Sequence, residues 1–199
     1  MKTLNHTLLF LLLPVSLHAQ SSSQERAFAP YTTCSFTDGL TMVATDPLTP
    51  GTISRTVTTM KGTYSVALAA GRRVMFAYPG EDFYANVKVE ILPEQGYAAS
   101  REALISDFEH TLASGDAARN YVLKPRLNGF QIQGLDRVKR EGGVLGIYLF
   151  FDDAHRAVTT IYFLNQDPPK HFKTMSEYAI LRDHFLDQYT SCIRKTATP

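Results

Sequence analysis

The chain has 199 residues, of which 44% are hydrophobic, and it carries 20 Lys and Arg residues against 19 Asp and Glu residues. This length and apolar content suit one globular domain with its own core. The net charge is close to zero and no long basic run is present, so we expect no nucleic-acid partner.

The N-terminus has the features of an export signal. Lys2 supplies a positive start, Leu8 to Leu13 form an apolar run, and Leu17-His18-Ala19 is a small-residue cleavage motif. The apolar run is too short for a transmembrane helix, which needs roughly 20 apolar residues, and no later segment qualifies. We therefore predict a signal peptide over residues 1–19 and a secreted or periplasmic protein that is soluble after cleavage near Ala19.

The sequence contains only two cysteines, Cys34 near the start of the predicted domain and Cys192 near its end. Two cysteines usually pair in an oxidising compartment, and closing so long a loop stabilises a fold by about 4–5 kcal/mol in the chain-entropy model. The alternative is a reactive thiol, but the chain has no C-x-x-C motif and no histidine close to either cysteine. We predict a structural disulfide.

The segment that follows the cleavage motif is polar and begins with a run of serines, so we predict a flexible lead-in over residues 20–33. No linker or internal repeat divides the remainder. We therefore expect a single globular domain over residues 34–195.

Strand patterns dominate the first half of this domain. The expected strands are Leu40–Val43, Ile53–Met60, Tyr64–Leu68, Arg72–Tyr78 and Phe83–Leu92. In the last of these, Val87 and Val89 alternate with Lys88, which is the pattern of a half-buried strand. Asp46-Pro47 is expected to lie in a turn after the first strand.

A helix and a second group of strands come next. Ser100 suits the N-cap of a helix that continues to about Ser114, before Gly115. The strands expected after it are Tyr121–Leu127, Phe130–Val138, Val144–Phe151 and Ala157–Leu164. Tight turns such as Asn128-Gly129 separate them, which favours an antiparallel meander.

A closing helix is expected after Thr174, where Thr174 and Glu177 have the spacing of a capping box. Its apolar stripe comprises Tyr178, Leu181, Phe185, Tyr189 and Cys192. Cys192 would therefore face the body of the protein, as a disulfide to Cys34 requires. The predicted fold class is α+β: an antiparallel sheet covered by two main helices, similar to an α/β/α sandwich, with one disulfide.

From Arg73 to Tyr189 the chain resembles the PsbP-like family of exported and lumenal domains. The matching features are Phe76-Ala77-Tyr78-Pro79, the Val87-Lys88-Val89-Glu90 strand, the Ser100 helix, the hairpin from Asn128 to Gly134, the strands Gly146–Phe151 and Thr159–Phe163, and the closing helix. The chain departs from the family by lacking a Trp after Pro79 and by carrying extra N-terminal strands. The resemblance implies an accessory, assembly or binding role, and it supplies no catalytic residue.

The chain contains no G-x-S-x-G, phosphate-binding loop, H-E-x-x-H, C-x-x-C or EF-hand motif, so we predict no catalytic residue, metal ligand or cofactor. Asp152, Asp153 and His155 form the one cluster that could hold a metal or transfer a proton. They also lie where a hairpin must turn, and Asp is a common turn residue. The plain turn is the favoured interpretation.

The aromatic residues are explained best by a core on both faces of the sheet, and a binding groove on one face is the alternative. They are concentrated in the strands, where they would form a two-sided core or leave an apolar groove on one face. The turn that holds Tyr78, Phe83 and Tyr84 could form the rim of such a groove. His155 and His171, the second in a proline-rich connection, are further candidate binding residues.

The leading hypothesis is an exported, non-enzymatic binding or accessory domain that recognises an unknown protein or a small apolar ligand. The alternative is an exported hydrolase or metal-dependent enzyme with a site near Asp152, Asp153 and His155. The sequence does not identify the ligand, the compartment beyond export, or the oligomeric state.

Overall fold

The computed structural model describes residues 17–36, 40–48, 54–59, 62–67, 70–77, 83–114, 120–123, 126–138, 144–165 and 174–197. Its helices are α1 (Leu17–Thr32), α2 (Glu94–Ser114) and α3 (Met175–Ala197). Its strands are β1 (Thr41–Leu48), β2 (Ser54–Thr59), β3 (Gly62–Ala67), β4 (Ala70–Ala77), β5 (Phe83–Ile91), β6 (Asn120–Leu123), β7 (Arg126–Leu127), β8 (Phe130–Val138), β9 (Val144–Asp152) and β10 (Ala157–Asn165).

The main sheet has the strand order β1-β4-β5-β10-β9-β8-β6, and the short β7 also pairs with β8. All of its described pairings are antiparallel. Strands β2 and β3 form a separate two-stranded sheet. The predicted α+β class with an antiparallel sheet is confirmed.

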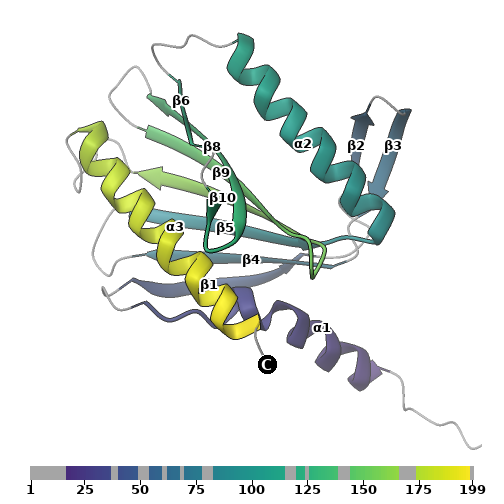
Figure 1. The fold of residues 1–199 in the computed structure, drawn as a ribbon. Helices are drawn as coiled ribbons and strands as arrows, with labels where there is room; N and C mark the ends of the chain where they lie inside the picture. The colour runs from purple at the N-terminus through teal and green to yellow at the C-terminus, as the bar shows by residue number, and fades with distance from the viewer. Residues whose placement is uncertain are drawn as a thin grey trace, which may run out of the picture.

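Apolar side chains cover both faces of the sheet, as the sequence predicted for its central strands. Tyr148 and Phe150 of β9 belong to a core shared with α1 and α3, whereas Leu149 and Phe151 belong to a second core shared with α2. Because successive strand residues point to opposite faces, the two cores lie on opposite sides of the sheet. Helices α1 and α3 therefore cover one face and α2 covers part of the other (Figure 1).

Most strands begin and end within about two residues of their predicted positions. Strand β1 is the main exception, because it continues through Asp46 and Pro47, where a turn was expected. It is the terminal strand of the sheet, and an edge strand tolerates proline because its outward side needs no ladder hydrogen bond. The predicted strand Tyr121–Leu127 is divided into β6 and β7.

Helix α2 begins at Glu94, so the prediction of Ser100 as its N-cap is wrong. The first turn closes where the Tyr97 amide donates to the Pro93 carbonyl at 2.8 Å. Tyr97 is buried against the sheet, and this packing outweighs the low helix propensity of the adjacent Gly96. Ser100 lies inside the helix and is fully buried.

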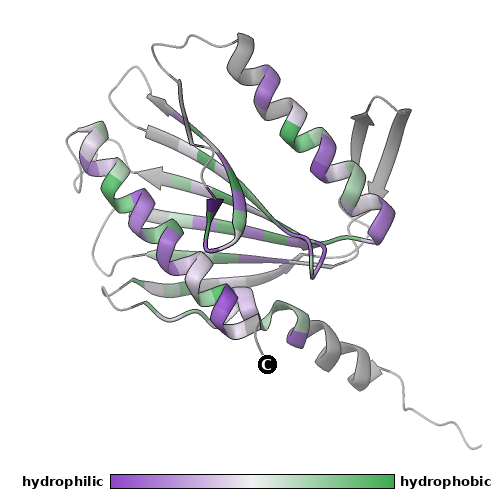
Figure 2. Ribbon diagram, viewed as in Figure 1, coloured by the Kyte–Doolittle hydropathy of each residue, from purple (hydrophilic) through white to green (hydrophobic). Residues whose placement is uncertain are grey.

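Helix α3 begins as predicted, with the Glu177 amide donating to the Thr174 hydroxyl at 3.2 Å. Its predicted stripe faces the sheet, since Tyr178, Phe185 and Tyr189 are buried there. Hydrophobic and hydrophilic residues alternate along α3 (Figure 2), as a helix with one face on a sheet requires. None of the described helices is long and apolar enough to cross a membrane.

The flexible lead-in expected over residues 20–33 is instead helical, because α1 spans Leu17–Thr32. Phe28 and Tyr31, three residues apart and so on one side of the helix, are fully buried in the core shared with α3. This burial anchors the segment and overrides its polar composition. Most of the predicted signal peptide lies outside the described residues, and its cleavage stays a prediction.

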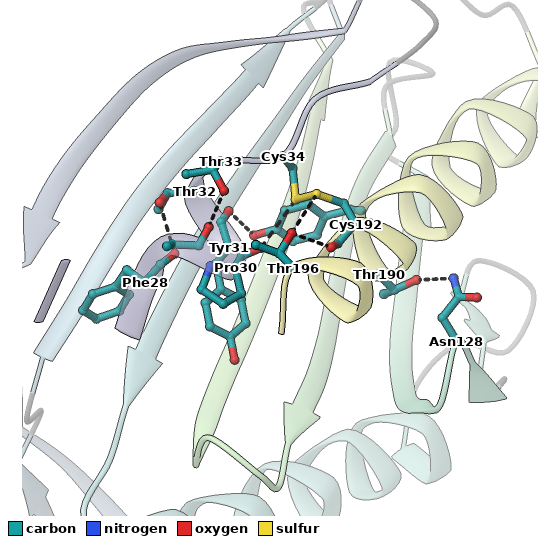
Figure 3. The surroundings of a disulfide bond; sticks show 12 residues. Phe28, Pro30, Tyr31, Thr32, Thr33, Cys34, Asn128, Thr190, Cys192 and Thr196 are labelled. Atoms are coloured by element: carbon teal, nitrogen blue, oxygen red, sulfur yellow. Dashed lines mark hydrogen bonds between the residues drawn. A yellow bond between two sulfur atoms is a disulfide. The ribbon is translucent and has the colours of Figure 1, made fainter. Parts of the chain in front are cut away.

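The predicted disulfide between Cys34 and Cys192 is present, with 5.7 Å between the two Cα atoms (Figure 3). It joins the end of α1 to the C-terminal half of α3. A second contact lies alongside it, where the Tyr189 hydroxyl donates to the Tyr31 carbonyl at 2.9 Å. These contacts fix α1 against α3 at two neighbouring points.

The turn that precedes β8 is also attached to α3. Asn128 and Gly129 have φ angles of 49° and 85°, which match the predicted two-residue hairpin turn. The side-chain amide of Asn128 donates to the Thr190 hydroxyl at 2.9 Å (Figure 3). The Arg194 guanidinium donates to the backbone carbonyl of Asn128 at 3.1 Å. The hairpin and the disulfide therefore hold the same half of α3.

Replacing both Cys34 and Cys192 with serine should lower the free energy of unfolding by about 2–5 kcal/mol, because the disulfide closes a long loop in the unfolded chain. Urea unfolding of the purified protein measures this loss. Reducing the wild-type protein should give the same loss as the double substitution. Equal stability of the oxidised, reduced and substituted forms would contradict a stabilising role.

Candidate functional site

Asp152 ends β9, and its carboxylate is almost completely buried. One oxygen accepts a hydrogen bond from the Tyr31 hydroxyl of α1 at 2.8 Å and lies 2.9 Å from Nδ1 of His155. The other accepts from the backbone amides of Ala154 and His155 at 3.2 and 3.3 Å. Asp152 therefore stabilises the turn and anchors α1 at the same time.

Asp153, the next residue, contacts a different helix. Its carboxylate accepts a hydrogen bond from the Tyr97 hydroxyl of α2 at 2.7 Å and lies 3.3 Å from the Arg101 guanidinium. Arg101 also lies over the Phe151 ring and donates to Gln131 at 3.1 Å. The two neighbouring carboxylates are thus used to hold helices on opposite faces of the sheet.

Of the predicted cluster of Asp152, Asp153 and His155, only two side chains are in contact. Asp152 and His155 are in contact, with 7% and 42% of their side chains exposed, whereas Asp153 is engaged with α2. In the part of the chain that the structure describes, no group of three or more His, Cys, Asp or Glu side chains could hold a metal ion. The contacts observed for Asp152 and Asp153 are structural, as the turn interpretation expects.

A second buried carboxylate, Asp136 of β8, was not identified from the sequence. It accepts hydrogen bonds from the hydroxyls of Tyr148 and Tyr178, each at 2.7 Å, and from the Arg182 guanidinium. Asp136 is fully buried, and the positive charge of Arg182 compensates its negative charge. The available sequence signal was an acidic residue within the predicted strand Phe130–Val138.

Two glycines make room for this network. Gly134 lies directly opposite Tyr148, and a Cβ atom on Gly134 would meet the Tyr148 ring at 2.1 Å. Gly146 lies directly opposite Asp136, and a Cβ atom there would meet the Tyr178 hydroxyl at 2.0 Å. The absence of side chains at these positions lets both tyrosine hydroxyls reach the carboxylate.

The buried tyrosines resist ionisation. Burial, the nearby charge of Asp136 and hydrogen bonding to it raise the pKa of Tyr148 and Tyr178 far above the usual value. Burial is also the main cause of the raised pKa of Tyr31, with Asp152 adding to it. These hydroxyls are therefore held as hydrogen-bond donors.

Other predicted binding residues are not placed in a site. Tyr78 and His171 lie outside the described residues. Phe83 and Tyr84 begin β5, where Tyr84 pairs with Ala77 and Leu164, but their side chains are not described. The proposed rim of an aromatic groove stays a prediction.

A row of half-buried side chains crosses the sheet face that carries α2. We call it the transverse row; each member lies directly opposite the next on the adjacent strand, in the order Leu135, Ile147, Tyr162, Asn86 and Met75. The row spans five strands, or about 19 Å at the usual strand spacing. Within the described residues, no member of the row belongs to either core.

The transverse row lies two residues along the strands from Leu149, which α2 covers. This step corresponds to about 7 Å. Four of its five members are apolar and remain partly accessible; Leu135, Ile147 and Tyr162 are adjacent, and the polar Asn86 separates them from Met75. The row is therefore a partly accessible, mainly apolar feature on the sheet face that α2 covers.

The α2 side of the sheet also holds polar atoms without partners. Ser100 Oγ on α2 and Gln133 Oε1 on β8 are buried and have no hydrogen-bond partner in the described part of the structure. Such atoms cost about 1–3 kcal/mol each when nothing satisfies them. The opposite side holds such an atom as well, Thr159 Oγ1 of β10, although the buried carboxylate of Asp136 has three donors there.

Comparison with protein-family models, curated proteins and solved structures finds no match to this chain. The proposed role therefore depends on the residues and contacts described above.

Asp152→Ala should lower the free energy of unfolding by about 2–3 kcal/mol, since it leaves the buried Tyr31 hydroxyl without an acceptor. Asp153→Ala should cost less than about 1 kcal/mol, because Asp153 is mostly exposed and solvent screens its ion pair. Urea unfolding of both variants measures the difference. Equal losses would show that Asp152 does not anchor α1 in this way.

Stability should fall as the pH rises above about 10, where tyrosines in the unfolded chain lose their protons. The folded chain keeps these protons because the pKa values of Tyr148, Tyr178 and Tyr31 are raised, so the unfolded state is favoured progressively at alkaline pH. Unfolding free energies across a pH series, with phenolate absorbance, measure this effect. Tyr178→Phe should reduce the slope, and titration of every tyrosine at its usual pKa in the folded protein would contradict the expectation.

Proposed function

We propose that this protein is an exported, non-enzymatic binding domain that recognises an apolar segment of a partner protein. The observation that carries the proposal is the transverse row, Leu135, Ile147, Tyr162, Asn86 and Met75, which leaves apolar surface accessible beside α2. Sheet faces in α+β domains are normally covered by helices or other chain segments. A partner segment lying along the row would complete that layer.

The length of the transverse row favours a protein segment over a small molecule as the occupant. Small-ligand sites are concave and enclose most of the ligand, whereas the members of this row are half-buried along a line of about 19 Å. A line of this length matches a helix of about 13 residues at the usual rise per residue. A small apolar ligand is the other occupant that the sequence allowed, and the experiment below distinguishes it.

The disulfide supports export. Stable structural disulfides form in oxidising compartments, and Cys34 and Cys192 are paired here. A binding or accessory role also agrees with the role that the PsbP-like resemblance implies.

The enzymatic alternative stays a prediction with less support. A hydrolase or metal site needs its reactive groups to converge on one substrate position. Asp152 and His155 meet, but Asp152 is already bonded to Tyr31 and Asp153 is bonded to Tyr97 on the other face.

Ile147→Lys should abolish partner capture, because a lysine at the centre of the row replaces apolar contact with a charge that is costly to bury. The tagged protein is cross-linked in the exported fraction of its own cells, and the captured proteins are quantified by mass spectrometry. A specific partner should be depleted about tenfold or more by this change, which corresponds to at least about 1.4 kcal/mol.

Ile180→Lys is the matched control, since Ile180 is 68% exposed on α3 and lies away from the row. It should capture the partner as well as the wild type does. Tyr162→Ser provides a second variant of the row, and circular dichroism checks that all variants are folded. Equal capture by all forms, or a small apolar molecule retained in native mass spectra without a protein partner, would overturn the proposal.

The intact mass of the exported protein tests the compartment separately. It should correspond to a chain that begins at Gln20 and that lacks the two thiol hydrogens lost on forming the disulfide. A full-length chain with free thiols would contradict export while leaving the binding test unaffected.

A further inference from the structure

The hairpin turn that precedes β8 contains Asn128 followed by Gly129, which is the one Asn-Gly pair in the sequence. Asparagine is thermolabile, and it loses its side-chain amide most readily before glycine, because glycine has no Cβ atom to hinder attack by its backbone nitrogen. Both residues are exposed. The turn therefore presents a reactive pair to water.

In the folded chain the side-chain amide of Asn128 is held by α3. Its nitrogen donates to the Thr190 hydroxyl at 2.9 Å and to the Asp187 carbonyl at 3.1 Å, and it lies 3.3 Å from the Asp187 carboxylate. Figure 3 shows this amide directed at Thr190. The side chain is thus fixed toward a helix, whereas deamidation requires it to fold back onto the nitrogen of the next residue.

We propose that Asn128 is a deamidation site of this protein, that its attachment to α3 controls the rate, and that the reaction weakens the same attachment. In the reaction, the Gly129 nitrogen gives up its proton and bonds to Cγ of Asn128, while the bond from Cγ to the amide nitrogen breaks. That nitrogen takes up the proton and leaves as ammonia, and a five-membered succinimide remains. Water then opens the ring and gives aspartate or isoaspartate, each with one carboxylate. No electrons are transferred, and water is the only co-reactant.

The rate depends on how often the turn leaves α3. The attack needs a side-chain position that the contacts to Asp187 and Thr190 exclude, so it takes place in molecules where these contacts have opened. The reaction should then follow the equilibrium population of the open form. Folding protects Asn128 for as long as the turn stays attached, and this protection does not depend on partner binding.

The product is a poorer match to α3 than asparagine is. A carboxylate at position 128 has no N–H to donate, and it would face the carboxylate of Asp187, which the Asn128 nitrogen now contacts. Two carboxylates in contact disfavour each other's charge. Arg194 donates to the backbone carbonyl of Asn128, so one positive charge lies beside two negative ones. Aspartate tolerates the positive φ of 49° as asparagine does, so the loss comes from the side chain.

Peptide mass spectrometry of the purified protein, sampled over several weeks at neutral pH, tests the control of the rate. Asn128 should deamidate at least about tenfold more slowly in the folded protein than in urea. Thr190→Val removes one acceptor at nearly constant shape, so the folded variant should react about fivefold faster, as expected for losing one hydrogen bond. Thr196→Val, the same change on an exposed part of α3, should leave the rate unchanged.

The unfolded proteins supply the control for the chemistry. In urea the wild type and both variants should deamidate at one rate, because the sequence around Asn128 is the same in all three. Asn86 and Asn120 precede larger residues and should remain intact while Asn128 reacts. Equal rates at Asn128 in the folded and unfolded wild type, or earlier reaction at Asn86 or Asn120, would overturn the proposal.

Asn128→Asp installs the product directly and tests its effect on α3. Backbone amides of residues 186–194 should exchange hydrogen faster in this variant than in the wild type, and Asn128→Ser, which adds no charge, should have a smaller effect. Combining Asn128→Asp with Asp187→Asn should restore protection, because the amide introduced at position 187 can donate to the carboxylate. Equal exchange in the Asp and Ser variants, or no restoration by the second change, would overturn the proposed weakening.

Discussion

The alternation of side chains along β9 and β10 is the constraint on which this structure depends. Successive residues point to opposite faces, so a single strand contributes Tyr148 and Phe150 to one core and Leu149 and Phe151 to the other. The same alternation continues into the turn, where Asp152 bonds to α1 and Asp153 bonds to α2. One hairpin therefore positions both helical layers.

The contacts that hold the helices differ between the two faces of the sheet. On the α1 and α3 side, the disulfide, the Tyr189 hydrogen bond and the Asp136 network fix the helices, although the buried Thr159 Oγ1 of β10 has no described partner there. On the α2 side, Ser100 and Gln133 retain buried polar atoms without described partners. The transverse row also remains partly accessible there. The partly accessible transverse row is the reason that the proposed recognition is placed on the α2 face.

Local sequence patterns were sufficient for the strands and for the start of α3. Alternation located β5, and apolar runs bounded by turn residues located β8, β9 and β10, each to within about two residues; Thr174 marked the helix start correctly. The patterns failed where tertiary contacts override local preference. Burial of Tyr97 extends α2 past Gly96, and burial of Phe28 and Tyr31 orders a segment whose serines and charges suggested flexibility.

The sequence by itself determined the α+β class, the strand order along the chain and the pairing of Cys34 with Cys192, because alternation, turn residues and a count of two cysteines are local or compositional signals. Only the tertiary structure showed which helix packs on which face of the sheet. It separated Asp153 from Asp152, placed Asp136 among distant tyrosines, and aligned the transverse row from five strands. These features depend on which strands and helices pack together, and contacts between residues far apart in the sequence cannot be located from local patterns alone.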